Sequence, residues 1–271
     1  MIQATCKPAL AAFALALTLP VYLSAHRQWM LPSATVISSN NGWVTVDAAV
    51  SNELFYFDHV PMRLQNLVIQ APDGSKLEPQ NVATGKYRST FDVQLTQPGT
   101  YKIAQVGASA FANWTENGVP RNWRGSLADV SKEVPRKAEN LQVSKMNNRV
   151  EVFVTAGKPT RNVLEPTGLG LEIVPVTHPN DLVTGEDATF QFLLNGQPAA
   201  NLEVTVIPGG IRYRDALLEA KYKTDAEGRF TVKFATPGMY WMNAAVGAGG
   251  RGRTGSGDRS SYVAVLEVMA Q

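Results

Sequence analysis

Cysteine is almost absent from this sequence of 271 residues, because the single Cys6 lies close to the N-terminus. Residues 26–271 therefore cannot form a disulfide or a thiolate metal site. Their stability must come from ordinary hydrophobic cores, and the chain is long enough for one large core or two small ones. Any transition-metal site would have to use histidine, carboxylate, methionine or a terminal amine as ligands.

Long apolar runs are also scarce, and the clearest one is at residues 9–19, after Lys7. The segment ends with the small residues Ser24 and Ala25, which completes the pattern of a secretory signal peptide. The run is shorter than the roughly 20 residues that span a bilayer as a helix. We therefore expect residues 1–25 to direct export to the periplasm and to be removed. An uncleaved anchor is the alternative. Cys6 precedes the apolar run, so it is not a lipoprotein cysteine.

Charge of one sign does not predominate: 25 Lys and Arg against 23 Asp and Glu give a formal net charge of +2. This balance argues against nucleic acid or an anionic membrane as a partner.

The chain has no G-x-S-x-G, H-E-x-x-H or P-loop motif. A Gly-rich basic stretch at 247–261 follows a strand-like run without a helix behind it, which argues against dinucleotide binding. We therefore predict that the protein is not an enzyme.

Short alternating runs of apolar and polar residues dominate the chain from residue 43 onward. Turn sequences such as Pro72-Asp73-Gly74 and Asn195-Gly196 separate them. Strands of this length and spacing predict an all-β fold. We expect two immunoglobulin- or prealbumin-like β-sandwich modules, at residues 26–160 and 168–271, joined by a connector rich in Pro and Gly.

Residues 107–148 interrupt this pattern with weak periodicity and scattered charge. They contain Trp114 and Trp123, and Pro135 limits any helix between residues 126 and 139 to a short one. We predict a long irregular excursion from the first module, with both tryptophans packed on its sheet.

Several motifs, taken in order, resemble one family. They are "AHRQWMLPS" after the leader, "GLGLEIVPVTHPNDLVTGE" in the middle, and "NGQPAANLEVTVIP", "YKTDAEGRFTVKF" and "TPGMYWM" towards the end. This order resembles the bacterial periplasmic family catalogued as domain of unknown function 4198. The resemblance spans nearly all of residues 26–271. It implies a link to the periplasmic components of cobalt and nickel uptake systems.

Three histidines are available for a metal site after the leader: His26, His59 and His178. Imidazole suits Ni, Co, Cu and Zn. If cleavage exposes His26, its α-amine (pKa about 7.7–8.0) and its imidazole can chelate one ion. A third imidazole would complete a T-shaped site that resembles the histidine brace of copper proteins. Trp29 is expected to anchor the first strand and so to hold this terminus in place.

Each histidine also has a plainer interpretation. His26 can belong to a frayed terminus, and His59 can be a half-buried, hydrogen-bonded residue of an aromatic cluster. His178, between Pro175 and Pro179, can be a solvated loop residue. Asp58 next to His59 is expected to point to the opposite face of a regular strand.

Three functions follow from these alternatives. The first is a periplasmic metal-associated binding protein that serves cobalt or nickel uptake together with a membrane transport component. The second is a structural or interaction module of two β-sandwiches without a metal. The third is a redox protein with a copper histidine brace.

Overall fold

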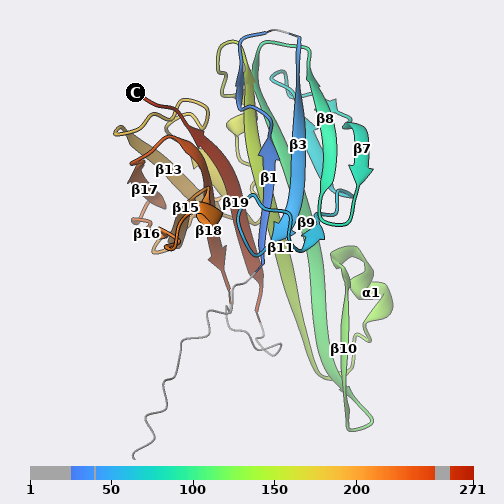
Figure 1. Cartoon of the computed structure of the whole chain (residues 1–271). Coiled ribbons are helices and arrows are strands. Elements are labelled where there is room, and N and C mark those ends of the chain that lie inside the picture. The colour runs from blue at the N-terminus through green and yellow to red at the C-terminus, as the bar shows by residue number, and fades with distance from the viewer. Residues whose placement is uncertain (1–25, 40, 248–256) are drawn as a thin grey trace, which may run out of the picture.

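The computed structural model of the chain describes residues 26–39, 41–247 and 257–271. The predicted signal peptide, with Cys6, and most of the Gly-rich stretch at 247–261 lie outside these ranges. Among the described residues, no helix is both long enough and apolar enough to cross a membrane. The fold is all-β, as predicted, and the described residues form three sheets (Figure 1).

The first sheet has five strands in the order β1-β3-β8-β7, with β4 also paired to β3. Its strands are β1 (Arg27–Pro32), β3 (Gly42–Ser51), β4 (Val60–Pro61), β7 (Gln80–Thr84) and β8 (Ser89–Leu95).

The second sheet has ten strands in the order β16-β15-β18-β19-β11-β9-β5-β6, with β10 on β9 and β2 on β11. Its strands are β2 (Val36–Ile37), β5 (Leu67–Gln70), β6 (Lys76–Leu77), β9 (Gly99–Glu116), β10 (Val119–Ser126), β11 (Glu139–Ala156), β15 (Glu203–Pro208), β16 (Ala220–Lys223), β18 (Gly238–Val246) and β19 (Arg259–Val268). β11 and β19 run parallel, so this sheet joins the N-terminal and C-terminal halves of the chain.

The third sheet has four strands in the order β12-β13-β14, with β17 on β13. Its strands are β12 (Leu171–Pro175), β13 (Asp187–Leu194), β14 (Gln197–Pro198) and β17 (Arg229–Lys233). The helices are short: α1 (Val130–Glu133) and the 3-10 turns η1 (Leu127–Asp129), η2 (Asn162–Leu164) and η3 (Ile211–Tyr213).

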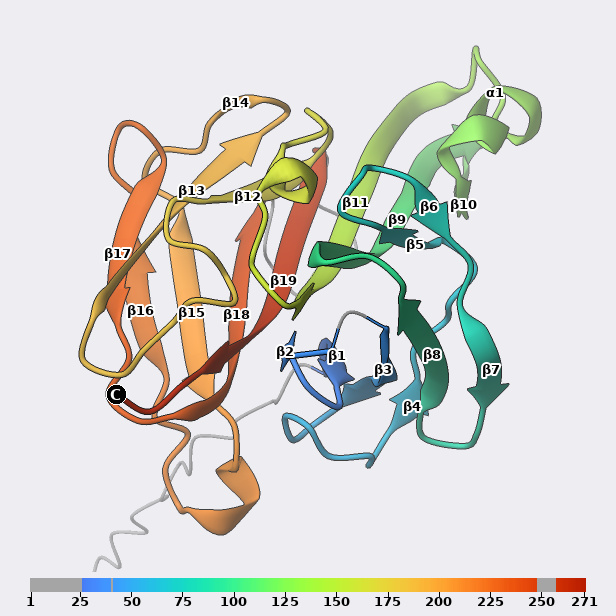
Figure 2. The same cartoon turned by 90° about the horizontal axis from the view of Figure 1, so that it is seen from above.

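Two hydrophobic cores lie on the two faces of the ten-stranded sheet. The five-stranded sheet lies on one side of it and the four-stranded sheet on the other (Figure 2). Because side chains alternate along a strand, β11 serves both cores. Val150, Val152 and Val154 pack in the first core, as predicted from their spacing, whereas Phe153 packs in the second. β19 and β18 are shared between the cores in the same way. The boundary between two modules, predicted between residues 160 and 168, stays a prediction.

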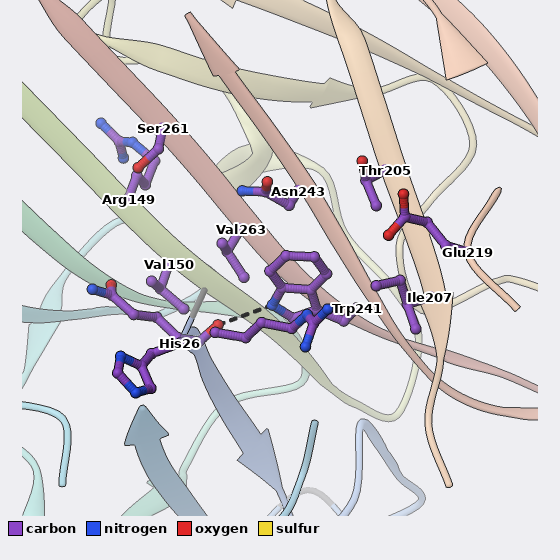
Figure 3. A pocket seen from close by; sticks show the side chains of 12 residues that line it. His26, Arg149, Val150, Thr205, Ile207, Glu219, Trp241, Asn243, Ser261 and Val263 are labelled. Carbon is purple, nitrogen blue, oxygen red and sulfur yellow. Dashed lines mark hydrogen bonds between the residues drawn. The ribbon is translucent and has the colours of Figure 1, made fainter. Parts of the chain in front are cut away.

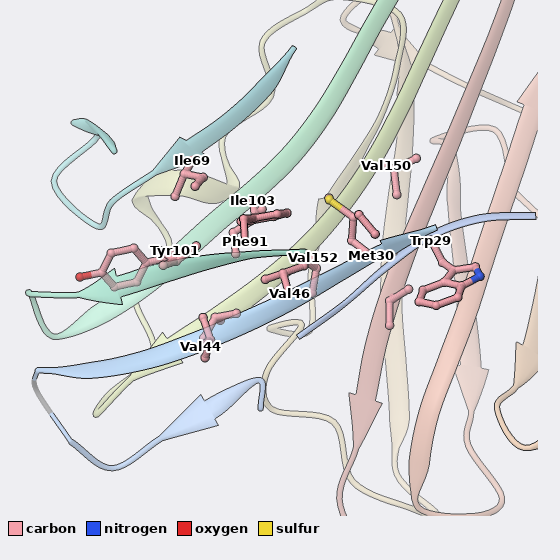
Figure 4. Packing of buried hydrophobic residues seen from close by; sticks show 14 of the residues in the cluster. Trp29, Met30, Val44, Val46, Ile69, Phe91, Tyr101, Ile103, Val150 and Val152 are labelled. Atoms are coloured by element: carbon pink, nitrogen blue, oxygen red, sulfur yellow. The ribbon is translucent and has the colours of Figure 1, made fainter. Parts of the chain in front are cut away.

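The first core lies between the five-stranded sheet and the β9–β11 region (Figure 4). Trp29 and Met30 of β1 are fully buried there, so β1 is anchored as predicted. Burial of a side chain of this size contributes about 1.5–3 kcal/mol to stability. The second core contains Phe230, Val232 and Phe234, which share a face as predicted.

Residues 107–148 form an arm that projects beyond the rest of the molecule (Figure 1). The prediction of an irregular excursion was wrong in one respect, because the arm is a regular antiparallel ribbon with β9 between β10 and β11. Polar side chains on both faces of an exposed ribbon hide the period-2 pattern, which explains the error. Both tryptophans have their partners within the arm. Trp114 on β9 lies opposite Arg121 on β10 in the strand register, and the Trp123 indole nitrogen donates a hydrogen bond to the Glu133 carboxylate at 2.6 Å. The helix is short, as expected.

Candidate metal-binding site at the start of the first strand

Two of the three predicted ligands lie side by side. His26 directly precedes β1 and His59 directly precedes β4. Both strands pair antiparallel with β3. Val50 of β3 lies opposite Gln28 of β1 on one side and opposite Val60 of β4 on the other. β1 and β4 therefore flank β3 and begin at the same end of the sheet. The two imidazole rings stack there with centroids 3.7 Å apart and planes 5° from parallel.

The start of β1 is held firmly on the protein. The Trp29 indole nitrogen donates to Ser51 Oγ at 2.7 Å, and its ring contacts Phe55 and Phe57. The Arg27 guanidinium donates to the carbonyl oxygen of Asn52 at 2.8 Å. These contacts fix the backbone immediately after His26.

The loop that carries His59 is also fixed. The Asp58 carboxylate accepts hydrogen bonds from the backbone N–H groups of Asn52 and Glu53, at 2.9 and 3.3 Å. Asp58 therefore closes the loop rather than acting beside His59. Phe55 has a φ of 62°, which is rare for a bulky residue and costs of order 1–3 kcal/mol. Its ring fits against Gly209, where an added Cβ would lie 3.0 Å from Phe55 Cδ2.

A groove of about 350 Å³ opens beside His26 (Figure 3). Trp241 lies in its middle and donates from its indole nitrogen to the Gln28 carbonyl oxygen at 2.9 Å. The Arg27 guanidinium lies 5.9 Å from the centre of the Trp241 ring. Burial lowers the pKa of Arg27, and the charge of Glu219, which also lines the groove, partly opposes this shift. We call this cavity the histidine groove.

The stacked arrangement has a consequence for metal binding. An imidazole lone pair lies in the ring plane, and metal–nitrogen bonds are about 2.0–2.1 Å long. Since the planes of His26 and His59 are nearly parallel, an ion in the plane of one ring lies outside the plane of the other. At least one ring must therefore rotate before both can bind one ion. Among the described residues, no group of three or more His, Cys, Asp or Glu side chains is arranged to hold a metal.

His178 does not join the pair. It is 7% exposed, not solvated, and both ring nitrogens have partners. Nδ1 accepts from the Asn180 N–H, while Nε2 lies 3.1 Å from both the Thr160 carbonyl oxygen and Thr100 Oγ1. Burial lowers its pKa. The Thr100 hydroxyl contacts Thr155 on β11, five residues and so about 16 Å along the strand from the histidine groove at Val150.

Sequence patterns did not identify Arg27, Glu219 and Trp241 as parts of a site. Strand alternation in "GMYWMNAAV" separates Trp241 from Tyr240 and Met242, which pack in the second core. This alternation was the sequence signal for a special role of Trp241. It indicates that Trp241 points to the opposite face of the strand, but it does not indicate that β1 packs on that face.

The family model described as "Domain of unknown function (DUF4198)" matches residues 23–247. No curated protein matches the sequence. Among solved structures, the D0-D1 domain of intimin is similar over 88% of this chain and 96% of that chain, with 13% identity and a TM-score of 0.22.

Two further structures cover most of this chain, which spans only a part of each. Dimeric latent PorU from Porphyromonas gingivalis matches over 93% of this chain and 21% of that one, with 13% identity and a TM-score of 0.22. Escherichia coli alpha-2-macroglobulin activated by porcine elastase matches over 91% of this chain and 31% of that one, with 10% identity and a TM-score of 0.21. These low TM-scores leave the site to be interpreted from its own geometry.

Proposed function

The chain belongs to the DUF4198 family, and from this premise we propose that it is a periplasmic, non-catalytic protein that binds a transition-metal ion at His26 and His59. Its role is to assist the uptake of cobalt or nickel together with a membrane transport component. One observation carries the proposal: two imidazoles from distant parts of the sequence are in contact at the start of an anchored strand.

The third ligand is the α-amine that removal of residues 1–25 would create on His26. An amine and an imidazole of the same residue form a chelate, and His59 supplies the third nitrogen. Metal binding displaces a proton from the amine, which costs little near its pKa of about 7.7–8.0. His26 is exposed, so an ion bound there can pass to a partner. Nitrogen ligands favour Cu over Ni and Co in intrinsic affinity, so metal supply decides which ion is carried.

Calorimetric titration with Ni²⁺, Co²⁺ and Cu²⁺ tests this proposal. The protein that starts at His26 should bind one ion. The His59→Ala variant should bind at least tenfold more weakly, because the loss of one of three nitrogen ligands removes at least about 1.4 kcal/mol.

A protein with one extra residue, starting at Ala25, is the matched control. It keeps every side chain of the site and moves only the amine. We expect it to bind as weakly as the His59→Ala variant. Equal affinities in all three proteins would exclude the site, and a natural mature chain that starts elsewhere than His26 would remove the terminal ligand.

The second candidate function is an interaction module of β-sandwiches without a metal. One observation favours it: no cluster of three or more potential ligand side chains exists among residues 26–39, 41–247 and 257–271. The same titration separates the two functions, because an interaction module should give no saturable heat with any of the three ions.

A further inference from the structure

We propose that a second cavity, which shares Gln28 with the histidine groove, binds a small organic molecule with two anionic groups, such as a dicarboxylate or a bisphosphate. This cavity has a volume of about 750 Å³ and lies at the root of the arm. We call it the amide groove. Its volume falls within the range of about 300–1,000 Å³ that is typical of small-molecule sites.

The amide groove lies between two sheets. One wall is the row Gln28, Val50 and Val60, which runs across β1, β3 and β4. Gln105 and Asn148, on the neighbouring strands β9 and β11, belong to the opposite wall. All of these positions lie on paired strands, so the groove is built on rigid elements.

The chemistry of the lining selects for an anion. Among the described residues, two arginines line the groove, Arg63 after β4 and Arg124 on β10, and no carboxylate does. Neither arginine forms an ion pair within the described part of the chain. Guanidinium groups bind carboxylate and phosphate oxygens through paired hydrogen bonds. A ligand with two acidic groups can engage both arginines, which a single small anion cannot.

The groove also offers polar groups for the uncharged part of the ligand. Side-chain amides of five residues line it: Gln28, Gln65, Asn66, Gln105 and Asn148. Gln105 Oε1 is buried and has no hydrogen-bond partner. A buried acceptor without a donor is unfavourable. When the Gln105 side chain turns toward the groove, a ligand hydroxyl or N–H group satisfies this acceptor.

Gly107 keeps the floor of the groove open. It lies on β9 next to Asn148, and an added Cβ would meet no atom closer than Asn148 Cβ at 3.8 Å. Its φ is not positive, so a β-branched residue can replace it without backbone strain. Gly107→Val therefore fills the groove and removes none of its polar groups.

The site does not depend on the metal. Gln28 lines both the amide groove and the histidine groove, but the described residues that line the amide groove include no histidine. Binding can thus be measured on metal-free protein, and its failure would leave the proposed metal function untouched.

Titration calorimetry with malate, glycerol 1,3-bisphosphate and glycerol tests the proposal. We expect one of the two anions to bind and glycerol not to bind, and the anion that binds identifies the acidic group. Gly107→Val should weaken binding at least tenfold. Gly85→Val is the matched control in the β7–β8 turn, where an added Cβ meets nothing closer than 3.6 Å, and it should bind like the unmodified protein.

Gln105→Leu provides a readout that loss of folding cannot imitate. It removes the unpartnered acceptor, so we expect an unchanged or higher melting temperature together with weaker binding of the anion. The proposal is wrong if no anion binds, if glycerol binds as well as the anions, or if Gly107→Val and Gly85→Val have equal affinities.

Discussion

His26, His59 and His178 have the same side chain, and their surroundings give them different chemistry. His26 and His59 meet at one end of the first sheet with their rings stacked, and His26 is exposed while His59 is half-buried. His178 is enclosed, with one nitrogen accepting from the Asn180 N–H and the other facing Thr160 and Thr100. A ring nitrogen that already has a short hydrogen bond is not available to a metal. The hydrogen bonds thus distinguish a structural histidine from two potential ligands.

The stability of the protein should depend on pH through His178. Burial lowers its pKa in the folded state, whereas an unfolded histidine has a pKa of about 6.5. Below this pH the unfolded chain takes up a proton that the folded chain resists, so the free energy of unfolding falls as the pH drops. His178→Asn should lower this free energy by about 1–3 kcal/mol at pH 7.5, through lost hydrogen bonds.

The variant should also flatten the pH dependence between pH 7.5 and 5. Urea unfolding of both proteins across this range measures the effect. Parallel stability curves would show that another group is responsible.

At the scale of elements, the arm differs from the other strands because it contributes nothing to the hydrophobic cores. Neither hydrophobic core contains a residue from 107–148, although β9 and β11 each contribute to a core below the arm. The arm is held by ladder hydrogen bonds and by a few contacts such as the Lys145 N–H to Asp258 at 2.9 Å. It is therefore an appendage of the ten-stranded sheet.

Removal of the arm should leave the rest of the protein folded. Ala110 and Lys145 are paired across β9 and β11. Replacement of residues 111–144 by Asn-Gly should therefore close a hairpin through a type I′ turn. Because neither of the two hydrophobic cores loses a residue, we expect the free energy of unfolding to change by about 1 kcal/mol or less, or about 2–4 °C in melting temperature.

The same deletion removes Arg124 from the amide groove, so anion binding should weaken although stability is kept. Thermal unfolding and calorimetry on one sample separate these effects. A fall of the melting temperature well beyond this range would show that the arm supports the cores.

At the scale of the whole molecule, sequence patterns predicted local features such as turns but did not predict contacts between residues that are distant in the sequence. Asp73 was predicted to lie in a turn, and its carboxylate accepts a hydrogen bond from the backbone N–H of Ser75, two residues later in the chain. Bonds from Ser75 and Gln97 lower the pKa of Asp73 to about 2. The contact between His26 and His59 could not be predicted, because it depends on the register of β1 and β4 against β3. The burial of His178 likewise depends on Thr100 and Thr160, which are distant in the sequence.

A buried ionic network also links the two halves of the chain. Arg149 on β11 lies 3.1 Å from Glu151 and 3.2 Å from Glu172 on β12, and the Tyr262 hydroxyl of β19 donates to Glu151 at 2.7 Å. Burial would raise the pKa of Glu172, but hydrogen bonds from Thr167 and the charge of Arg149 outweigh it and lower the pKa. Loss of one member of such a network leaves a charge buried without its partner, which costs about 3–5 kcal/mol.

These links predict that residues 26–271 unfold in one cooperative transition. The first core includes Ile207, Trp241, Val263 and Val265 from the C-terminal half, and the second includes Phe153 from the N-terminal half. Neither core can be completed by one half of the chain alone. Differential scanning calorimetry should therefore give a single peak, with equal calorimetric and van't Hoff enthalpies.

A pair of matched variants makes this test specific. Phe91→Ala empties a buried site in the first core and Phe192→Ala does so in the second, each at a cost of about 3–5 kcal/mol. If the two cores unfold together, both variants shift the same single peak to lower temperature by similar amounts. If the two cores were independent, each variant would shift only one of two peaks, and the predicted module boundary would then be a boundary of folding as well.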